Sequence, residues 1–136
     1  MRWTAAALLA LYSFFVARLT LAEPAAGRPV FDLADYWATH LSSGRMDWSE
    51  TEVLANVALF VPAGLLLAVV LGRPLLAAAL CVLASACIEL AQQRWFPTRV
   101  PSVADVEHNA LGAVIGAGLA GLLPRRRPIG RPGTWP

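Results

Sequence analysis

Four long apolar runs divide the chain. Residues 4–22 form the first run, which only Arg18 interrupts, and residues 53–72 form the second, which contains no charged residue. The third run covers residues 74–93 and becomes polar at its end, whereas the fourth covers residues 102–123 and is polar at its start. Because about 20 apolar residues in a helix cross the hydrocarbon core of a bilayer, each run predicts a membrane-spanning helix.

The first run has two interpretations. Arg2 precedes it, and Thr20-Leu21-Ala22 has the small residues that a signal peptidase accepts. We favour a retained helix, because the run is longer than the apolar stretch of about 7–15 residues in a signal peptide. The sequence therefore predicts an all-α fold, a polytopic membrane helical bundle of about four transmembrane helices, or three helices plus a signal peptide.

Residues 24–51 form a polar connector between the first two runs. Residues 23–29 contain two prolines and a glycine, which predicts a break in the helix. Four residues further on share one helical face: Phe31, Ala34, Trp37 and Leu41. A short helix lying in the membrane interface and an irregular loop with anchoring aromatic side chains both fit this pattern.

Composition supports a membrane protein. Hydrophobic residues make up 57% of the chain and charged residues only 15%, whereas soluble domains have about 25% charged residues. The net charge of +2 gives no indication of nucleic-acid binding.

Arginines predict the orientation. Arg2, Arg73 and the tail arginines Arg125–Arg127 fall on one side of a four-helix arrangement. Because basic residues collect on the cytoplasmic side, both termini should be cytoplasmic and the connector at 24–51 extracytoplasmic. Residues 1–23 are then the first helix or a signal peptide, 52–123 the main membrane domain and 124–136 a basic cytoplasmic tail.

Polar residues converge on the outer side of the predicted bundle. The helices alternate in direction, so the start of the second, the end of the third and the start of the fourth meet there. The residues at these positions are Glu52 and Asn56, Glu89 and Gln92, and Asp105 and Asn109. Helical spacing puts Ser85 on the face of Glu89, puts Gly112 and Gly116 on the stripe of Asp105 and Asn109, and turns Glu107 away.

An ionisable residue inside a span costs at least ~2.5–3.5 kcal/mol, so it usually faces the interior and has a partner. Glu89 and Asp105 are candidates for a catalytic acid–base pair, and Arg99 is a candidate third catalytic residue that pairs with them or holds a phosphate or carboxylate. Asn56, Asn109 and Gln92 are candidates for substrate binding. We interpret His108 as a solvated interfacial residue. The spacing predicts no metal site and no cofactor.

Two blocks of residues resemble the VanZ-like family of integral membrane proteins. Residues 56–64, Asn-Val-Ala-Leu-Phe-Val-Pro-Ala-Gly, resemble the family's Asn-x-x-Leu-Phe-x-Pro-x-Gly. The second block resembles the family's Glu-x-x-Gln, a connector with Arg, and then Asp-x-x-x-Asn-x-x-Gly-x-x-x-Gly. Its residues here are Glu89, Gln92, Arg99, Asp105, Asn109, Gly112 and Gly116. The resemblance covers about residues 52–121.

The resemblance implies a multi-pass protein of the bacterial cytoplasmic membrane with a polar cluster of this kind. The family takes its name from a protein linked to resistance to the glycopeptide antibiotic teicoplanin. The expected partners are membrane lipid and either a lipid-linked envelope precursor or a glycopeptide. Three hypotheses stay open: an envelope enzyme, a non-catalytic membrane protein that binds lipid or drug, and a purely structural helix bundle.

Overall fold

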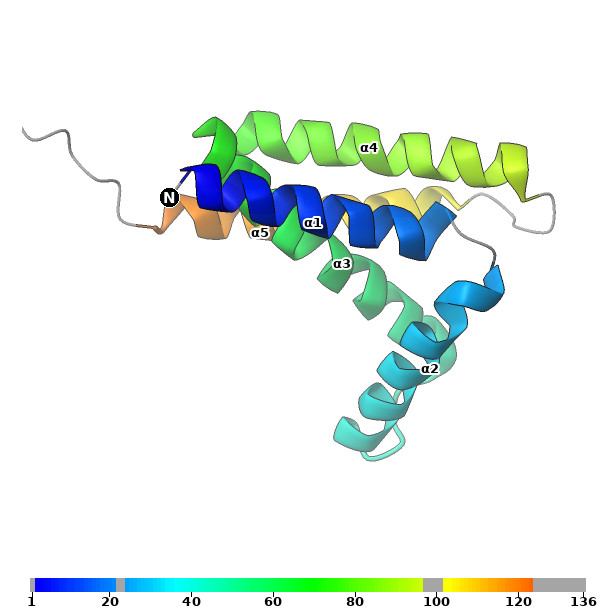
Figure 1. Ribbon diagram of the computed structural model, residues 1–136. Coiled ribbons are helices and arrows are strands. Elements are labelled where there is room, and N and C mark those ends of the chain that lie inside the picture. Colours follow the sequence, from blue (N-terminus) through cyan, green and yellow to red (C-terminus); the bar gives the residue numbers. More distant parts are fainter. Residues whose placement is uncertain (1, 22–23, 97–101, 124–136) are drawn as a thin grey trace, which may run out of the picture.

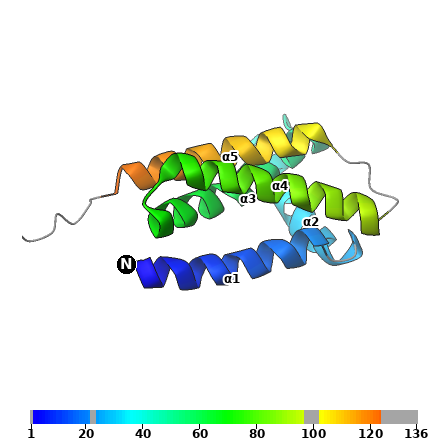
Figure 2. The same ribbon diagram turned by 90° about the horizontal axis from the view of Figure 1, so that it is seen from above.

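The structure, a computed structural model, describes residues 2–21, 24–96 and 102–123. In these ranges it contains five helices and no strand: α1 (Arg2–Leu21), α2 (Pro24–Leu41), α3 (Trp48–Leu71), α4 (Pro74–Trp95) and α5 (Val103–Gly121). Helices α1, α4 and α5 run lengthwise along the bundle, α3 packs against all three and crosses them at an angle, and α2 extends away from the bundle (Figures 1 and 2). The predicted all-α membrane bundle is confirmed.

Three of the helices in the described ranges, α1, α3 and α4, are long and apolar enough to cross a membrane. Helix α5 has a comparable length of 19 residues, but its first turns carry Asp105, Glu107, His108 and Asn109. It makes its most extensive contact with α3, along the interior of the bundle. Its polar start therefore faces protein as well as membrane.

The structure distinguishes between the two interpretations of the connector, a short helix and an irregular loop. Residues 24–41 are helical, so the interpretation as an irregular loop is wrong. The predicted helix break at residues 23–29 is also wrong for its larger part, because α2 begins at Pro24 and contains Pro29. A proline at the first position of a helix removes a donor that the first turn does not use, which explains Pro24 but not Pro29 inside the helix. Trp37 and Leu41 are exposed, as expected for a helix that rests on a membrane surface.

The ends of α3 are defined by local hydrogen bonds. The Asp47 carboxylate accepts a hydrogen bond from the Glu50 backbone N–H at 2.9 Å, and the Asp47 N–H donates to the Glu50 carboxylate at 3.2 Å. This reciprocal capping box satisfies backbone N–H groups that a helix start leaves open. At the other end Gly72 adopts φ 69°, a left-handed conformation that glycine adopts without strain.

Glycines allow α3 and α5 to approach closely. A methyl group added at Gly112 would collide with the backbone oxygen of Val57, and one added at Gly116 would collide with that of Val61. From the other side, a methyl group at Gly64 would collide with the backbone of Ala113. The predicted small-residue stripe of α5 is therefore confirmed as a packing surface. This backbone contact fixes the register in which the polar start of α5 meets its neighbours.

Candidate functional site

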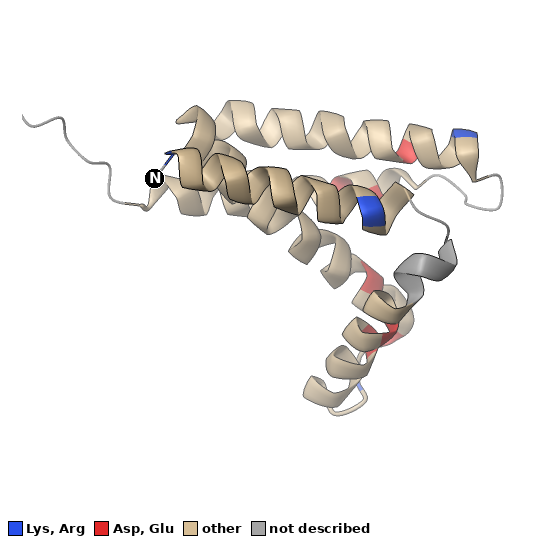
Figure 3. Ribbon diagram, in the orientation of Figure 1, with Lys and Arg blue, Asp and Glu red and all other residues tan. Residues whose placement is uncertain are grey.

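Acidic residues of α3, α4 and α5 lie toward the end of the bundle that is away from the N-terminus (Figure 3). This arrangement follows from the alternating directions of the three helices. The sequence predicted the same convergence from the positions of the polar residues. The candidate site therefore lies at this end of the bundle.

Asn56 on α3 binds Asp105 on α5. The Asn56 side-chain Nδ2 donates a hydrogen bond to Asp105 Oδ1 at 3.0 Å. Both side chains are half-buried, and the bond joins residues 49 positions apart in the sequence. The close glycine packing about two to three turns further along α5 holds the two helices at the distance this bond requires.

Ser102 connects the two candidate acids. It is the N-cap of α5, and its Oγ accepts a hydrogen bond from the Asp105 backbone N–H at 3.3 Å. Its own backbone N–H donates to Glu89 Oε2 at 3.2 Å. Glu89 on α4 and Asp105 on α5 therefore lie on either side of one helix start. We did not single out Ser102 from the sequence, although a serine three residues before an acidic residue is a typical N-cap signal.

One helical turn deeper, Asn109 binds Ser85. The Asn109 Nδ2 donates to Ser85 Oγ at 2.8 Å, and the two side chains are 7% and 0% exposed. Two buried atoms of α5, Asn109 Oδ1 and His108 Nδ1, have no hydrogen-bond partner among the residues that the structure describes. The interpretation of His108 as a solvated residue is therefore wrong for Nδ1, because α5 turns that atom into the protein.

Two residues that the sequence analysis expected here, Gln92 and Glu52, lie outside this cluster. Gln92 is buried and donates to the Thr20 backbone oxygen of α1 at 2.8 Å, so its side chain stabilises the end of α1. Glu52 is exposed, and the expectation that it forms a wall of the cluster is wrong. Arg99 lies outside the described residues. Glu107 is exposed, as predicted.

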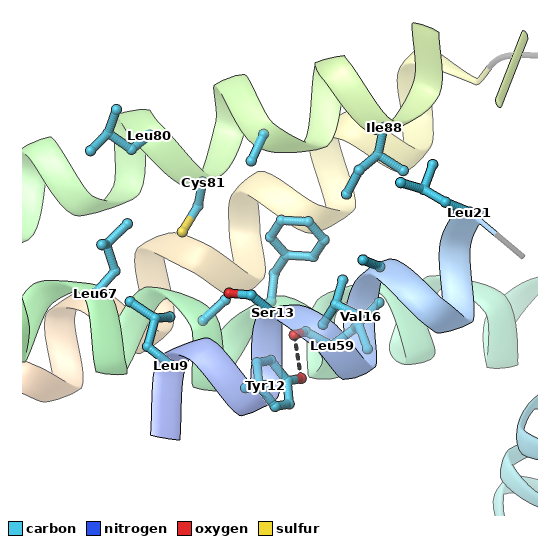
Figure 4. Close-up of a pocket in the computed structure, with 14 residues that line it drawn as sticks. Leu9, Tyr12, Ser13, Val16, Leu21, Leu59, Leu67, Leu80, Cys81 and Ile88 are labelled. Atoms are coloured by element: carbon cyan, nitrogen blue, oxygen red, sulfur yellow. Dashed lines mark hydrogen bonds between the residues drawn. The ribbon is translucent and has the colours of Figure 1, made fainter. Parts of the chain in front are cut away.

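The best-formed cavity of the described structure is apolar and lies elsewhere. It has a volume of about 240 Å³, is lined by α1, α3 and α4 and is open on one side (Figure 4). Its walls include Val16, Phe60, Leu67 and Ile88, and none of the five predicted site residues that the structure describes. The polar cluster is thus connected by hydrogen bonds between helices, and the open space adjoins it on the side of α1. Within the described ranges no three His, Cys, Asp or Glu side chains converge as metal ligands.

Helices long enough to cross a bilayer and a hydrogen-bonded polar cluster at one end define a multi-pass helical membrane protein. A comparison with protein families matches residues 3–124 to the family described as VanZ/LLP1. The chain therefore belongs to the VanZ/LLP1 family. The match begins within α1, so it extends well beyond the region of residues 52–121 in which the sequence showed the resemblance. Searches of curated proteins and of solved structures found no match.

Proposed function

We propose that this protein is a cell-envelope membrane protein whose polar cluster binds, and acts on, the head group of a lipid-linked or cell-wall substrate. The observation that carries the proposal is the pair of unpartnered buried atoms, Asn109 Oδ1 and His108 Nδ1. Buried polar atoms in a purely structural network are nearly always hydrogen-bonded. Two such atoms on α5, the helix that carries Asp105, support a site for a polar ligand.

The cluster contains groups for proton transfer and for orientation. Glu89 and Asp105 flank one helix start, so a substrate hydroxyl or phosphate placed there would meet both carboxylates. Asn56 fixes Asp105, and Asn109 Oδ1 is an acceptor for a donor on the substrate. In this proposal Arg99 holds a phosphate or carboxylate with its planar fork, as the sequence analysis expected.

A non-catalytic lipid- or drug-binding protein is the second candidate. It is supported by the bond that Asn56 already makes to Asp105, because a carboxylate held by an amide is suited to recognition as well as to catalysis. The two candidates share the same residues. They differ in whether a substrate is converted.

We further propose that the protein lies in the bacterial cytoplasmic membrane with both termini in the cytoplasm. This orientation rests on the arginines at positions 2, 73 and 125–127. A C-terminal tag should then react with a membrane-impermeant reagent only after the cells are permeabilised. Reaction in intact cells would refute the orientation.

The function is tested by removing charge without changing shape. Glu89→Gln and Asp105→Asn should reach the membrane at normal level, retain thermal stability and lose an envelope phenotype, such as survival on teicoplanin or turnover of a labelled lipid-linked precursor. Glu107→Gln is the matched control, because Glu107 is an exposed acid on the same helix. It should behave as the unmodified protein does.

The outcomes separate the hypotheses. Full activity in Glu89→Gln and Asp105→Asn would exclude both residues as catalytic groups. Misfolding of both variants would favour the structural bundle. A lost phenotype without any converted precursor in the unmodified protein would favour the non-catalytic binder.

A further inference from the structure

The apolar cavity between α1, α3 and α4 lies within the part of the protein that crosses the membrane. The three helices that line it are the three that are long and apolar enough to span a bilayer. Water is scarce at that depth, and the surrounding solvent is hydrocarbon. The occupant of the cavity must therefore be apolar.

The lining offers almost no polar group to an occupant. Of the side chains that form it, Tyr12 has its hydroxyl engaged, because it donates to the Leu59 backbone oxygen at 2.6 Å (Figure 4). Ser13 and Cys81 are the other two that carry a polar or sulfur atom. Aliphatic and aromatic groups such as Leu9, Phe60 and Leu80 form the rest. Such walls select hydrocarbon and exclude a head group.

The volume is large enough for a ligand. An apolar cavity of about 150 Å³ stays dry and accommodates benzene, and this one measures about 240 Å³. An unfilled space of this size deprives its walls of van der Waals contacts on one side. A flexible chain from the bilayer restores those contacts, because lipid tails are as apolar as leucine.

The cavity adjoins the polar cluster on two helices. On α3, Asn56 is one turn from Phe60, and Ala63 and Leu67 continue the same face into the cavity. On α4, Ser85 of the cluster is one turn from Cys81 of the cavity wall. An amphiphilic molecule with its chain in the cavity would therefore have its head group beside the cluster.

From these observations we infer that the cavity binds one fatty acyl chain of a membrane phospholipid. The inference rests on the proposed function in one respect: the head group of that lipid lies at the cluster of Glu89, Asp105 and Asn109. It assigns the substrate class as an acyl lipid and gives the chain a binding site of its own.

Photolabelling tests the inference. The full chain is reconstituted into phosphatidylethanolamine–phosphatidylglycerol vesicles that contain a trace of phospholipid with a diazirine on one acyl chain. After irradiation, adducts are located by mass spectrometry of peptides. We expect several-fold more adducts on the cavity walls at Leu67, Cys81 and Ala84 than on Leu83, which is 60% exposed on α4. Equal labelling of the walls and the outer surface would overturn the inference.

A pair of variants provides the matched control. Ala84→Phe fills the cavity from α4, and Leu83→Phe adds an aromatic ring outside it. Ala84→Phe should abolish the enrichment at Cys81, and Leu83→Phe should preserve it. Unchanged enrichment in Ala84→Phe would count against the site.

A competition experiment uses the unmodified protein, so its result does not depend on whether a variant folds. The vesicles already contain a large excess of unlabelled phospholipid, so the added competitor is a polyprenyl phosphate, which should leave the enrichment at Cys81 unchanged. Competition by the polyprenyl phosphate would replace the acyl chain with an isoprenoid and overturn the inference as stated.

Labelling does not depend on turnover, so the two proposals fail separately. Uniform labelling together with loss of phenotype in Glu89→Gln and Asp105→Asn overturns the acyl-chain site and leaves the proposed function in place. Enriched labelling together with full activity in those variants overturns the proposed function and leaves the acyl-chain site in place.

Discussion

At the scale of single residues, the side-chain amide of Asn109 both joins two helices and leaves one polar atom available. One end of its side chain is bonded to Ser85, and the oxygen at the other end is buried without a partner. Helical spacing predicted that Asn109 shares a face with Asp105, because both are on one helix. The spacing did not predict the partner, since Ser85 lies on a different helix whose rotation depends on tertiary packing.

A double-mutant cycle measures the Asn109–Ser85 bond. Interhelical hydrogen bonds in a membrane protein average about 0.6 kcal/mol and reach about 1.7 kcal/mol. We expect Ser85→Ala and Asn109→Leu to couple by about 0.5–1.5 kcal/mol in the free energy of unfolding, measured in micelles or bicelles. Strictly additive effects would show that the two side chains do not interact in the membrane.

Asp47 predicts a pH dependence at the start of α3. Hydrogen bonds from the Glu50 backbone N–H and from the Ser49 hydroxyl hold the pKa of the Asp47 carboxyl below its usual value. A lowered folded-state pKa means that the cap stabilises the helix fully above the ordinary aspartate pKa of about 3.9. That contribution is lost as the pH falls through the folded-state pKa.

Hydrogen exchange checks this sign. The Glu50 and Thr51 amides should be better protected in the unmodified protein than in Asp47→Ala near neutral pH. The difference should shrink as the pH falls below about 4. A difference that persists unchanged in strong acid would contradict the role of the carboxylate charge.

At the scale of helices, the apolar runs and the small-residue stripe were sufficient to predict the core of the fold. The length of an apolar run identifies a membrane-spanning helix, and glycines at positions i and i+4 identify a close contact between two helices. Local signals predicted α2 less well, because Pro24 and Pro29 suggested a break where a helix begins. The rotation that buries His108 Nδ1 was not predictable either, since it depends on which neighbours α5 meets.

The glycine contact predicts a position-specific effect of alanine. Gly112→Ala and Gly116→Ala place a methyl group against backbone oxygens of α3 and should cost about 1–3 kcal/mol of unfolding free energy. Gly118→Ala meets nothing within 4 Å and should be neutral or stabilise the helix by up to about 1 kcal/mol. Thermal unfolding in detergent compares the three. Similar losses for all three would exclude close packing as the cause.

At the scale of the whole molecule, three side chains attach α1 to the bundle. Arg2 donates to the Val70 and Leu71 backbone oxygens at the end of α3, at 3.1 and 3.3 Å. Tyr12 reaches Leu59 in the middle of α3, and Gln92 of α4 reaches Thr20 near the other end of α1. A retained helix, which we expect from the sequence, would keep these contacts, whereas cleavage of a signal peptide would remove them.

The retention of α1 is tested with a tag at each end of the chain. Both tags should be recovered on one polypeptide from the membrane fraction, because α1 is part of the packed bundle. An N-terminal sequence that starts after residue 22 would establish cleavage. Arg2→Ala should lower thermal stability without changing the length of the recovered chain.

The two sides of α3 differ in how freely its neighbours can move. Toward α5 the contact is backbone against backbone, where no rotamer can change, so these two helices should move as one rigid unit. Toward α1 the contact is made by side chains, several of which line the cavity. We therefore expect α1 to shift more readily than α5 relative to α3, while the register of Asn56 and Asp105 stays intact.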